Sequence, residues 1–220
     1  MNVCFLGDGP LAQVLGSAAE RRGFVLADVP YLSDLVFVAK EVDDHRSMEG
    51  VRDVMQWAVD NVPADVPIIV TSQVPPGWTR PWAHRRPEVY YQPHTLIRGH
   101  EADMAYAPDC IVVGSGDVSE PLPEAYAAYL AAYEVPVHRM SFESAELSKL
   151  AVNYLLAAHI TASNQLAFIA SQIGADWDEI VPSLRYDKRI GEHAYIRPGV
   201  IGGHLPRDVD TVNRLKATLQ

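Results

Sequence analysis

The sequence predicts an α/β protein in which a doubly wound, mostly parallel sheet is followed by a helical domain with one long helix. Short apolar runs alternate with helical or loop segments over the first 140 residues, a pattern typical of parallel sheets. A Gly-x-Gly turn joins the first apolar run to a helix, and a long helical pattern begins at residue 141. We therefore expect two domains, residues 1–140 and residues 141–220.

The first segment, MNVCFLGDGPLAQVLGSAAERRGF, contains a short strand, a glycine turn and a helical pattern that ends at Gly23. Such a turn presents free backbone N–H groups and the positive end of the helix dipole to a diphosphate. This is typical of a Rossmann-type dinucleotide site, which Gly7, Gly9, Pro10 and Leu11 would form. A tight strand-to-helix connection needs the same residues without any cofactor, so both interpretations stay open.

Asp28 ends the second apolar run, FVLAD, about 20 residues after the glycine turn. Its carboxylate could accept hydrogen bonds from a ribose diol and would repel a 2′-phosphate, which favours NAD without excluding NADP; alternatively, Asp28 is a solvated turn residue. Only about five residues separate this run from the next, too few for a crossover helix. We therefore expect a sheet trimmed at the edge that normally holds the adenosine side.

Four further strands complete the predicted sheet. They are expected at residues 34–39, 66–72, 88–93 and 110–116. Segments with helical or loop character separate them, among them SMEGVRDVMQWAVDNV. This alternation indicates parallel pairing through crossover connections.

Residues 141–173 contain neither proline nor glycine, and their apolar positions recur at helical spacing up to Gly174. These positions are Leu147, Leu150, Ala151, Tyr154, Leu155, Ala158, Leu166, Ile169 and Ile173. Because the helix is apolar on more than one face, we expect it to pack against a second copy, as a homodimer. Short helices are expected at 176–184 and 208–220, with a loop between them.

Composition narrows the possible partners. The 18 basic and 28 acidic residues give a net charge of −10, which argues against nucleic acid and anionic membranes as partners. The two cysteines, Cys4 and Cys110, lie in apolar runs predicted to be buried strands, so neither a disulfide scaffold nor a metal cluster is expected. Without a leader or a membrane-length apolar run, the sequence predicts a soluble, cytoplasmic protein.

Lys149 and Asn153 are four residues apart on the predicted long helix, so they project from one face. A lysine beside an amide could bind a substrate hydroxyl and take its proton as hydride leaves for a nicotinamide, provided that burial lowers the lysine pKa. The alternative is a lysine and an asparagine on an ordinary solvated helix face.

Four motifs follow one another in the second half: the helix ELSKLAVN, its continuation NQLAFIA, the triplet RIG and the loop GGHLPRD. In this order and at nearly these separations they resemble the UDP-glucose/GDP-mannose dehydrogenase family. In the first half, TSQVPPGWTR resembles the family's S-T-V-P-P-G-T turn, and YYQPHTLIRGHEADMAYAPDCIVVG resembles its N-P-E-F-L segment, so the resemblance covers nearly the whole chain, with a gap after Asp28. The resemblance implies a dinucleotide-binding domain followed by a dimerisation domain.

The resemblance also implies an activity. The family uses NAD to oxidise a nucleotide-sugar alcohol twice, through a cysteine that forms a thiohemiacetal and then a thioester. Its catalytic lysine, asparagine and aspartate match Lys149, Asn153 and Asp208, and an arginine that reaches the neighbouring subunit's substrate matches Arg189.

Three positions depart from the family pattern. Gln73, a candidate cofactor contact, replaces the threonine of the P-P-G turn. His94 replaces the glutamate of N-P-E-F-L, and the loop 202–206 has no cysteine. His94 is either a general base near neutral pH or a partner of a loop carbonyl. His204 is either a substrate contact or a structural loop residue.

These departures limit the expected reaction. Without the thiolate there is no covalent route from aldehyde to acid, and the chain ends near the end of the family's central domain, before the nucleotide-binding third domain. We therefore expect a single two-electron alcohol/carbonyl interconversion on a sugar-like or polyhydroxylated substrate held between the two domains. The alternatives are a catalytically inactive binding or scaffold protein, and a site completed by a separate protein.

Overall fold

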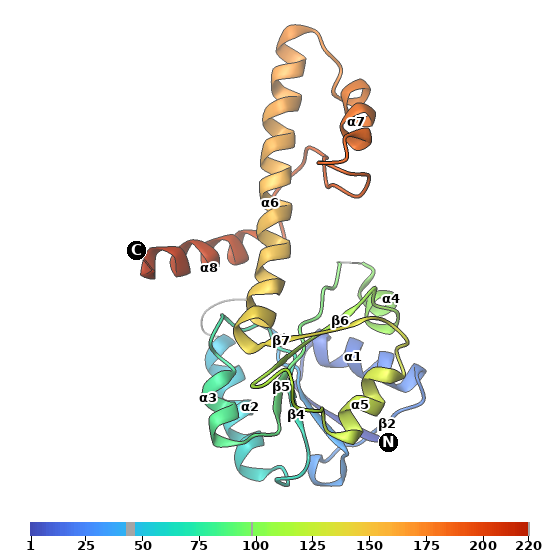
Figure 1. Cartoon of the computed structure of the whole chain (residues 1–220), viewed down its shortest axis with the longest axis vertical. Coiled ribbons are helices and arrows are strands. Elements are labelled where there is room, and N and C mark those ends of the chain that lie inside the picture. Colours follow the sequence, from blue (N-terminus) through green and yellow to red (C-terminus); the bar gives the residue numbers. More distant parts are fainter. Residues whose placement is uncertain (43–46, 98, 220) are drawn as a thin grey trace. The chain divides into compact units, whose positions relative to one another are not determined.

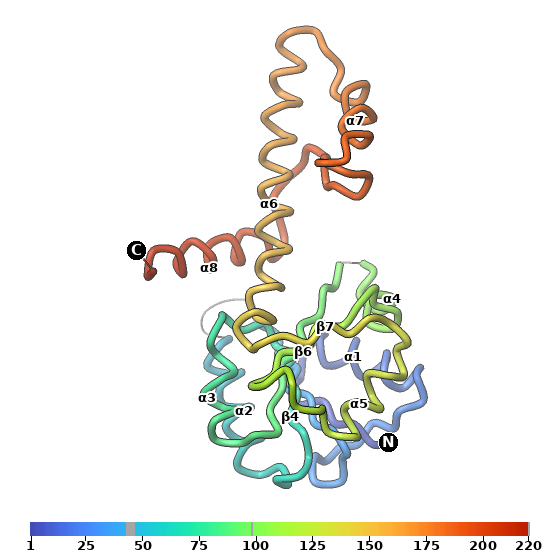
Figure 2. The backbone as a smooth tube through the Cα atoms, in the orientation of Figure 1, coloured from blue at the N-terminus to red at the C-terminus, as the bar shows by residue number. Residues whose placement is uncertain are grey.

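The computed structural model describes residues 1–42, 47–97 and 99–219 (Figure 1). The chain divides into two compact units, Met1–Lys149 and Leu150–Gln220. The boundary falls within the long helix, whose backbone runs on directly from the last strand of the sheet (Figure 2).

The first unit contains one seven-stranded sheet. Its strands are β1 (Asn2–Leu6), β2 (Val25–Leu26), β3 (Leu35–Val38), β4 (Ile68–Val70), β5 (Val89–Tyr91), β6 (Ile111–Ser115) and β7 (Val137–Ser141). Their spatial order is β2-β1-β3-β4-β5-β6-β7, and every neighbouring pair is parallel except β5 and β6. The predicted doubly wound, mostly parallel sheet is thus confirmed.

Helices connect the strands, and the last three make up most of the second unit. They are α1 (Pro10–Arg21), α2 (Ser47–Asn61), α3 (Arg80–Arg85), α4 (Glu101–Tyr106), α5 (Glu124–Ala131), α6 (Phe142–Ile173), α7 (Trp177–Tyr186) and α8 (Leu205–Thr218). Only the short 3₁₀ helix Pro30–Leu32 connects β2 to β3, as the short spacing there predicts. The sheet is therefore trimmed at β2, a two-residue edge strand.

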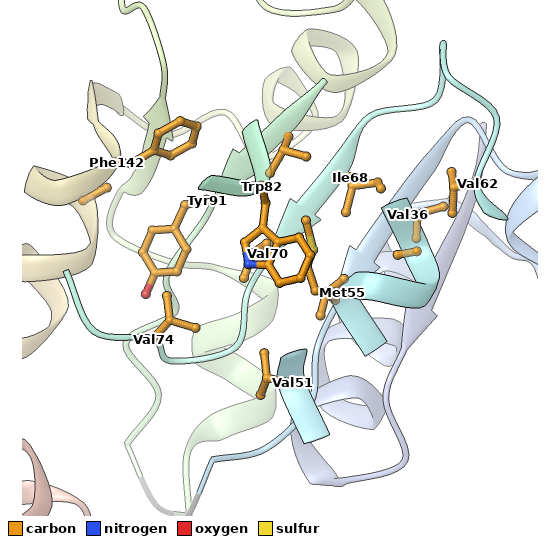
Figure 3. Packing of buried hydrophobic residues seen from close by; sticks show 14 of the residues in the cluster. Val36, Val51, Met55, Val62, Ile68, Val70, Val74, Trp82, Tyr91 and Phe142 are labelled. Carbon is orange, nitrogen blue, oxygen red and sulfur yellow. The ribbon is translucent and has the colours of Figure 1, made fainter. Parts of the chain in front are cut away.

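The two faces of the sheet are covered by different helices. Alternate residues of β3 point to opposite faces, as in any strand. Val36 and Val38 pack with α2, α3 and the first turn of α6, in the cluster that Figure 3 shows around Trp82 and Tyr91. Leu35 and Phe37 pack instead with α1 and α5. The sheet is thus the middle of three layers, and the carboxyl ends of β1, β3, β4 and β5 share one edge.

Two sequence predictions are wrong in detail. Cys110 was expected in a buried strand, but β6 begins one residue later and Cys110 is exposed, whereas Cys4 in β1 is buried. The helix expected at 208–220 begins three residues earlier, at Leu205, with Pro206 in its first turn. Asp208 therefore lies within the first turn of α8 rather than at its first residue.

Candidate active site

The glycine turn connects β1 to α1 at the carboxyl edge of the sheet. A Cβ atom on Gly7 would lie 2.4 Å from the carbonyl oxygen of Ala39, just beyond β3, so only glycine allows this approach. Gly9 precedes α1, and Pro10 and Leu11 begin it. The close approach explains Gly7 by packing alone, and a glycine turn before a helix N-terminus is also the arrangement on which a diphosphate site would depend.

A carboxylate already contacts this turn. Glu41 Oε2 accepts a hydrogen bond from the backbone N–H of Leu11 at 3.3 Å, in the first turn of α1. Asp8, between the two glycines, pairs with Lys40 Nζ at 2.9 Å, and this hydrogen bond lowers the Asp8 pKa. The residues present therefore fit a diphosphate by backbone shape, but Glu41 lies where an anion would bind at the helix N-terminus.

The other residues predicted to bind cofactor lie on neighbouring connections. Asp28 is exposed and comes two residues after β2. Gln73 comes three residues after β4, beside Ser72, whose hydroxyl accepts a hydrogen bond from the Lys40 backbone N–H at 2.9 Å. Gln73 thus lies at the same edge of the sheet as the glycine turn.

A chain of polar side chains leads from the core to His94, which follows β5. Tyr126 of α5 donates its hydroxyl proton to Gln92 Oε1 at 2.9 Å, and Gln92 Nε2 lies 3.4 Å from His94 Nε2. Tyr126 and Gln92 are buried, and His94 is partly buried. Burial and, next, the charge of Lys149 lower the pKa of His94 to about 4, so its imidazole is neutral at pH 7. The structure thus brings together His94 and Lys149.

Glu146 is a residue that the sequence analysis missed. It lies one turn before Lys149 on α6 and is fully buried. Its carboxylate accepts hydrogen bonds from the backbone N–H groups of Gly77 at 2.5 Å and Thr79 at 2.8 Å, and burial raises its pKa. Glu146 therefore ties the PPG turn to the start of α6; a glutamate among apolar positions of a helix was the signal for it.

In the second unit, Asn153 and Asp208 are brought together. Asn153 Nδ2 donates to Asp208 Oδ2, and Asp208 Oδ1 pairs with Arg207 Nε at 2.9 Å. Asp208 is 1% exposed, in the first turn of α8, where the helix dipole favours a negative charge. The amide of Asn153, one helical turn after Lys149, is thereby held in one orientation.

The last two predicted site residues lie on the surface of the second unit. The Arg189 side chain is 88% exposed and pairs with Asp187, with Nη2 2.6 Å from Oδ2. His204 is exposed and immediately precedes α8. Across residues 1–42, 47–97 and 99–219, no group of three or more histidine, cysteine, aspartate or glutamate side chains could hold a metal ion.

The fold and this site define the class of protein: a Rossmann-type α/β unit with a glycine turn, followed by a helical unit. Residues 143–220 match the UDP-glucose/GDP-mannose dehydrogenase family, central domain. Residues 143–220 are therefore similar to that central domain, in agreement with the resemblance found in the sequence.

Known proteins extend the similarity into the first unit. UDP-glucose 6-dehydrogenase YwqF of Bacillus subtilis (strain 168) is 25% identical over 203 residues, 86% of this chain and 46% of that protein. UDP-glucose 6-dehydrogenase of Pseudomonas aeruginosa is 33% identical over 132 residues, 59% of this chain and 29% of that protein. This chain thus spans less than half the length of these relatives.

The fold itself also matches solved structures. A UDP-glucose dehydrogenase from the hyperthermophilic archaeon Pyrobaculum islandicum superimposes with a TM-score of 0.76 at 23% identity, covering 99% of this chain and 64% of the other. A GDP-mannose dehydrogenase from Pseudomonas aeruginosa gives 0.65 at 18% identity, covering 100% and 65%. Within the part of this chain that the structure describes, no helix is long and apolar enough to cross a membrane.

Proposed function

We propose that this chain is an NAD(P)-dependent oxidoreductase that interconverts an alcohol and a carbonyl in one two-electron step. The substrate would be sugar-like or polyhydroxylated, in keeping with relatives that are named for nucleotide sugars. The observation that supports this most strongly is that Lys149 lies near the neutral His94. His94 follows β5, which ends at the same edge of the sheet as the glycine turn.

Each residue would have a distinct task. In its neutral amine form, Lys149 would take the proton of the substrate hydroxyl, and Asn153, oriented by Asp208, would bind the oxygen. Gly7, Gly9, Pro10 and Leu11 would hold the diphosphate, with Asp28 and Gln73 as further cofactor contacts and Arg189 and His204 as substrate contacts. A bound nicotinamide would supply hydride transfer.

The thioester step of the family would be missing. The loop that contains Gly202, Gly203 and His204 carries no thiol, and Cys4 is a buried strand residue whose pKa is raised by burial. Cys110 is exposed but precedes β6, in the first unit. A carbonyl product would therefore be released rather than held for a second oxidation.

Cofactor titration tests this proposal. NAD, NADP and their reduced forms would be added to the purified protein and binding followed by fluorescence. We expect NADH to bind, Lys149→Ala to abolish turnover while leaving the NADH affinity within about twofold, and the exposed Lys188→Ala to change neither. An unchanged rate in Lys149→Ala would remove this lysine from the mechanism.

A second function, a binding or scaffold protein without catalysis, is favoured by one observation. Glu41 occupies the N–H of Leu11 and would repel a diphosphate. If the chain is an enzyme whose cofactor affinity Glu41 weakens, Glu41→Gln should tighten NADH binding about fivefold, about 1 kcal/mol, whereas the exposed Glu20→Gln on the same α1 should not. Failure of the wild type and Glu41→Gln to bind any of the four dinucleotides would favour the scaffold.

A further inference from the structure

The polar chain Tyr126–Gln92–His94 has a direction that follows from hydrogen-bond chemistry. Tyr126 is fully buried, and burial raises its pKa well above the usual value, so its hydroxyl keeps its proton. The hydroxyl's hydrogen-bond partner among the described residues is the Gln92 amide, at 2.9 Å. A buried phenol proton needs an acceptor, so the carbonyl oxygen Oε1, and not the NH₂ group, must face Tyr126.

The amide orientation decides the protonation of His94. With Oε1 turned to Tyr126, the Gln92 NH₂ group faces His94 Nε2 at 3.4 Å and donates to it. A ring nitrogen that accepts a hydrogen bond carries no proton, so the proton of a neutral imidazole must be on Nδ1. Burial and, next, the charge of Lys149 lower the pKa of His94 to about 4. An imidazolium would in addition place an N–H group against the amide NH₂ of Gln92.

We propose that Tyr126 and Gln92 are positioning residues that hold His94 as the neutral Nδ1–H tautomer, so that His94 donates a hydrogen bond to the reacting substrate oxygen and is not a base. The proposal rests on the alcohol/carbonyl function proposed above. It changes the role expected from the sequence, where His94 was a candidate general base. With its Nε2 lone pair held by Gln92, His94 leaves Lys149 as the base.

The donor suits the reacting oxygen. As an alcohol loses its proton and hydride, negative charge builds up on the oxygen before the carbonyl forms, and a fixed N–H group stabilises that charge. A neutral imidazole can do so at pH 7 without giving up a proton. The family that the sequence resembles has a glutamate at this position, and an ionised glutamate can only accept hydrogen bonds. With histidine here, the side chain would donate a hydrogen bond instead.

Nitrogen-15 NMR of the histidine rings tests the tautomer without cofactor or turnover. In the full chain at pH 7, with His94 assigned by its loss in His94→Gln, we expect the Nδ1–H form to exceed the Nε2–H form by about tenfold or more. Tyr126→Phe frees the Gln92 amide to rotate and should bring the two forms to within about threefold of each other.

Tyr129→Phe is the matched control, because Tyr129 lies on the same helix α5, is 2% exposed, and its hydroxyl contacts Tyr133 instead of Gln92. It should leave the tautomer ratio unchanged. A wild-type His94 with its proton on Nε2, or an equal effect of Tyr126→Phe and Tyr129→Phe, would overturn the proposal.

Kinetics with UDP-glucose and NAD as probes test the donor role. Asparagine retains an N–H group near the Nδ1 position, whereas glutamine places its amide near Nε2. We therefore expect His94→Gln to lower kcat about 100-fold and His94→Asn about tenfold or less, with KM changed less than kcat. An equal loss in both variants would contradict donation from Nδ1. A wild type that binds no dinucleotide but keeps the Nδ1–H tautomer would contradict the oxidoreductase function alone.

Discussion

Large apolar side chains are mostly buried in the central strands of the first unit, whereas several on the long helix of the second unit are exposed. In the first unit, Phe37 is 1% exposed and Tyr91 fully buried, within clusters that cover both faces of the sheet. In the second unit, Leu155 is 58% and Ile173 73% exposed, although both belong to the periodic apolar positions of α6, and Phe168 of the same helix is 65% exposed. A periodic apolar stripe therefore predicts a helix reliably, but it does not say whether the covering surface comes from the same chain.

A pair of matched phenylalanine variants should give the largest difference between the units. Phe37 stacks on Phe5 with ring centroids 4.7 Å apart and also contacts Tyr129, so Phe37→Ala should lower the free energy of unfolding by about 3–5 kcal/mol. Phe168→Ala should cost about 0.5 kcal/mol or less at low protein concentration. Urea denaturation followed by circular dichroism measures both; equal losses would mean that Phe168 is covered in solution.

The second unit is expected to depend on a polar contact instead. Asp208→Asn removes the carboxylate that accepts from Asn153 and Arg207, and breaking such a buried pair should cost about 3 kcal/mol of unfolding free energy. The control is Asp210→Asn on the same helix, where an exposed pair with Arg214 predicts about 0.5 kcal/mol or less. Similar losses in the two variants would show that burial of Asp208 does not matter.

The exposed stripe of α6 predicts self-association, since the homodimer expected from the sequence would cover it. Leu155→Glu should weaken the dimer at least about tenfold, about 1.4 kcal/mol, in sedimentation velocity. Ser171→Glu, at an exposed polar position of the same helix, is the control. A wild type that sediments as a monomer at all concentrations would remove the homodimer.

The smallest effect is expected at an ion pair of the first unit. Arg80 holds the pKa of Glu143 at about 2, below its ordinary value of 4.5. A lowered carboxyl pKa means that the stabilisation is present above about pH 4.5 and is lost as the pH falls towards 2. Because both side chains are about a third exposed or more, we expect only about 0.5 kcal/mol. To measure this stabilisation, the unfolding free energies of the wild type and Glu143→Gln would be compared across this pH range. A difference that does not change with pH would show that the Arg80–Glu143 ion pair does not stabilise the fold.

The sequence predicted most of the sheet, because its central strands are short apolar runs bounded by turn residues. Strand β7 was missed, since its sequence VHRMS is partly exposed at the sheet edge and lacks an apolar run. Pro206 misled the prediction of α8, because a proline is accepted in the first turn of a helix. Among the site residues, the position of Lys149 and Asn153 on one helix followed from spacing alone.

What the sequence by itself determined is local. Glycines at a strand-to-helix turn, and four-residue spacing on a helix, set backbone geometry within a few residues. Only the tertiary structure decided which side chains meet across long separations: Glu41 with Leu11, Asn153 with Asp208, and Tyr126 with Gln92. These pairings depend on how strands and helices pack, and no local periodicity encodes them. The protonation of His94 is therefore a property of the folded chain.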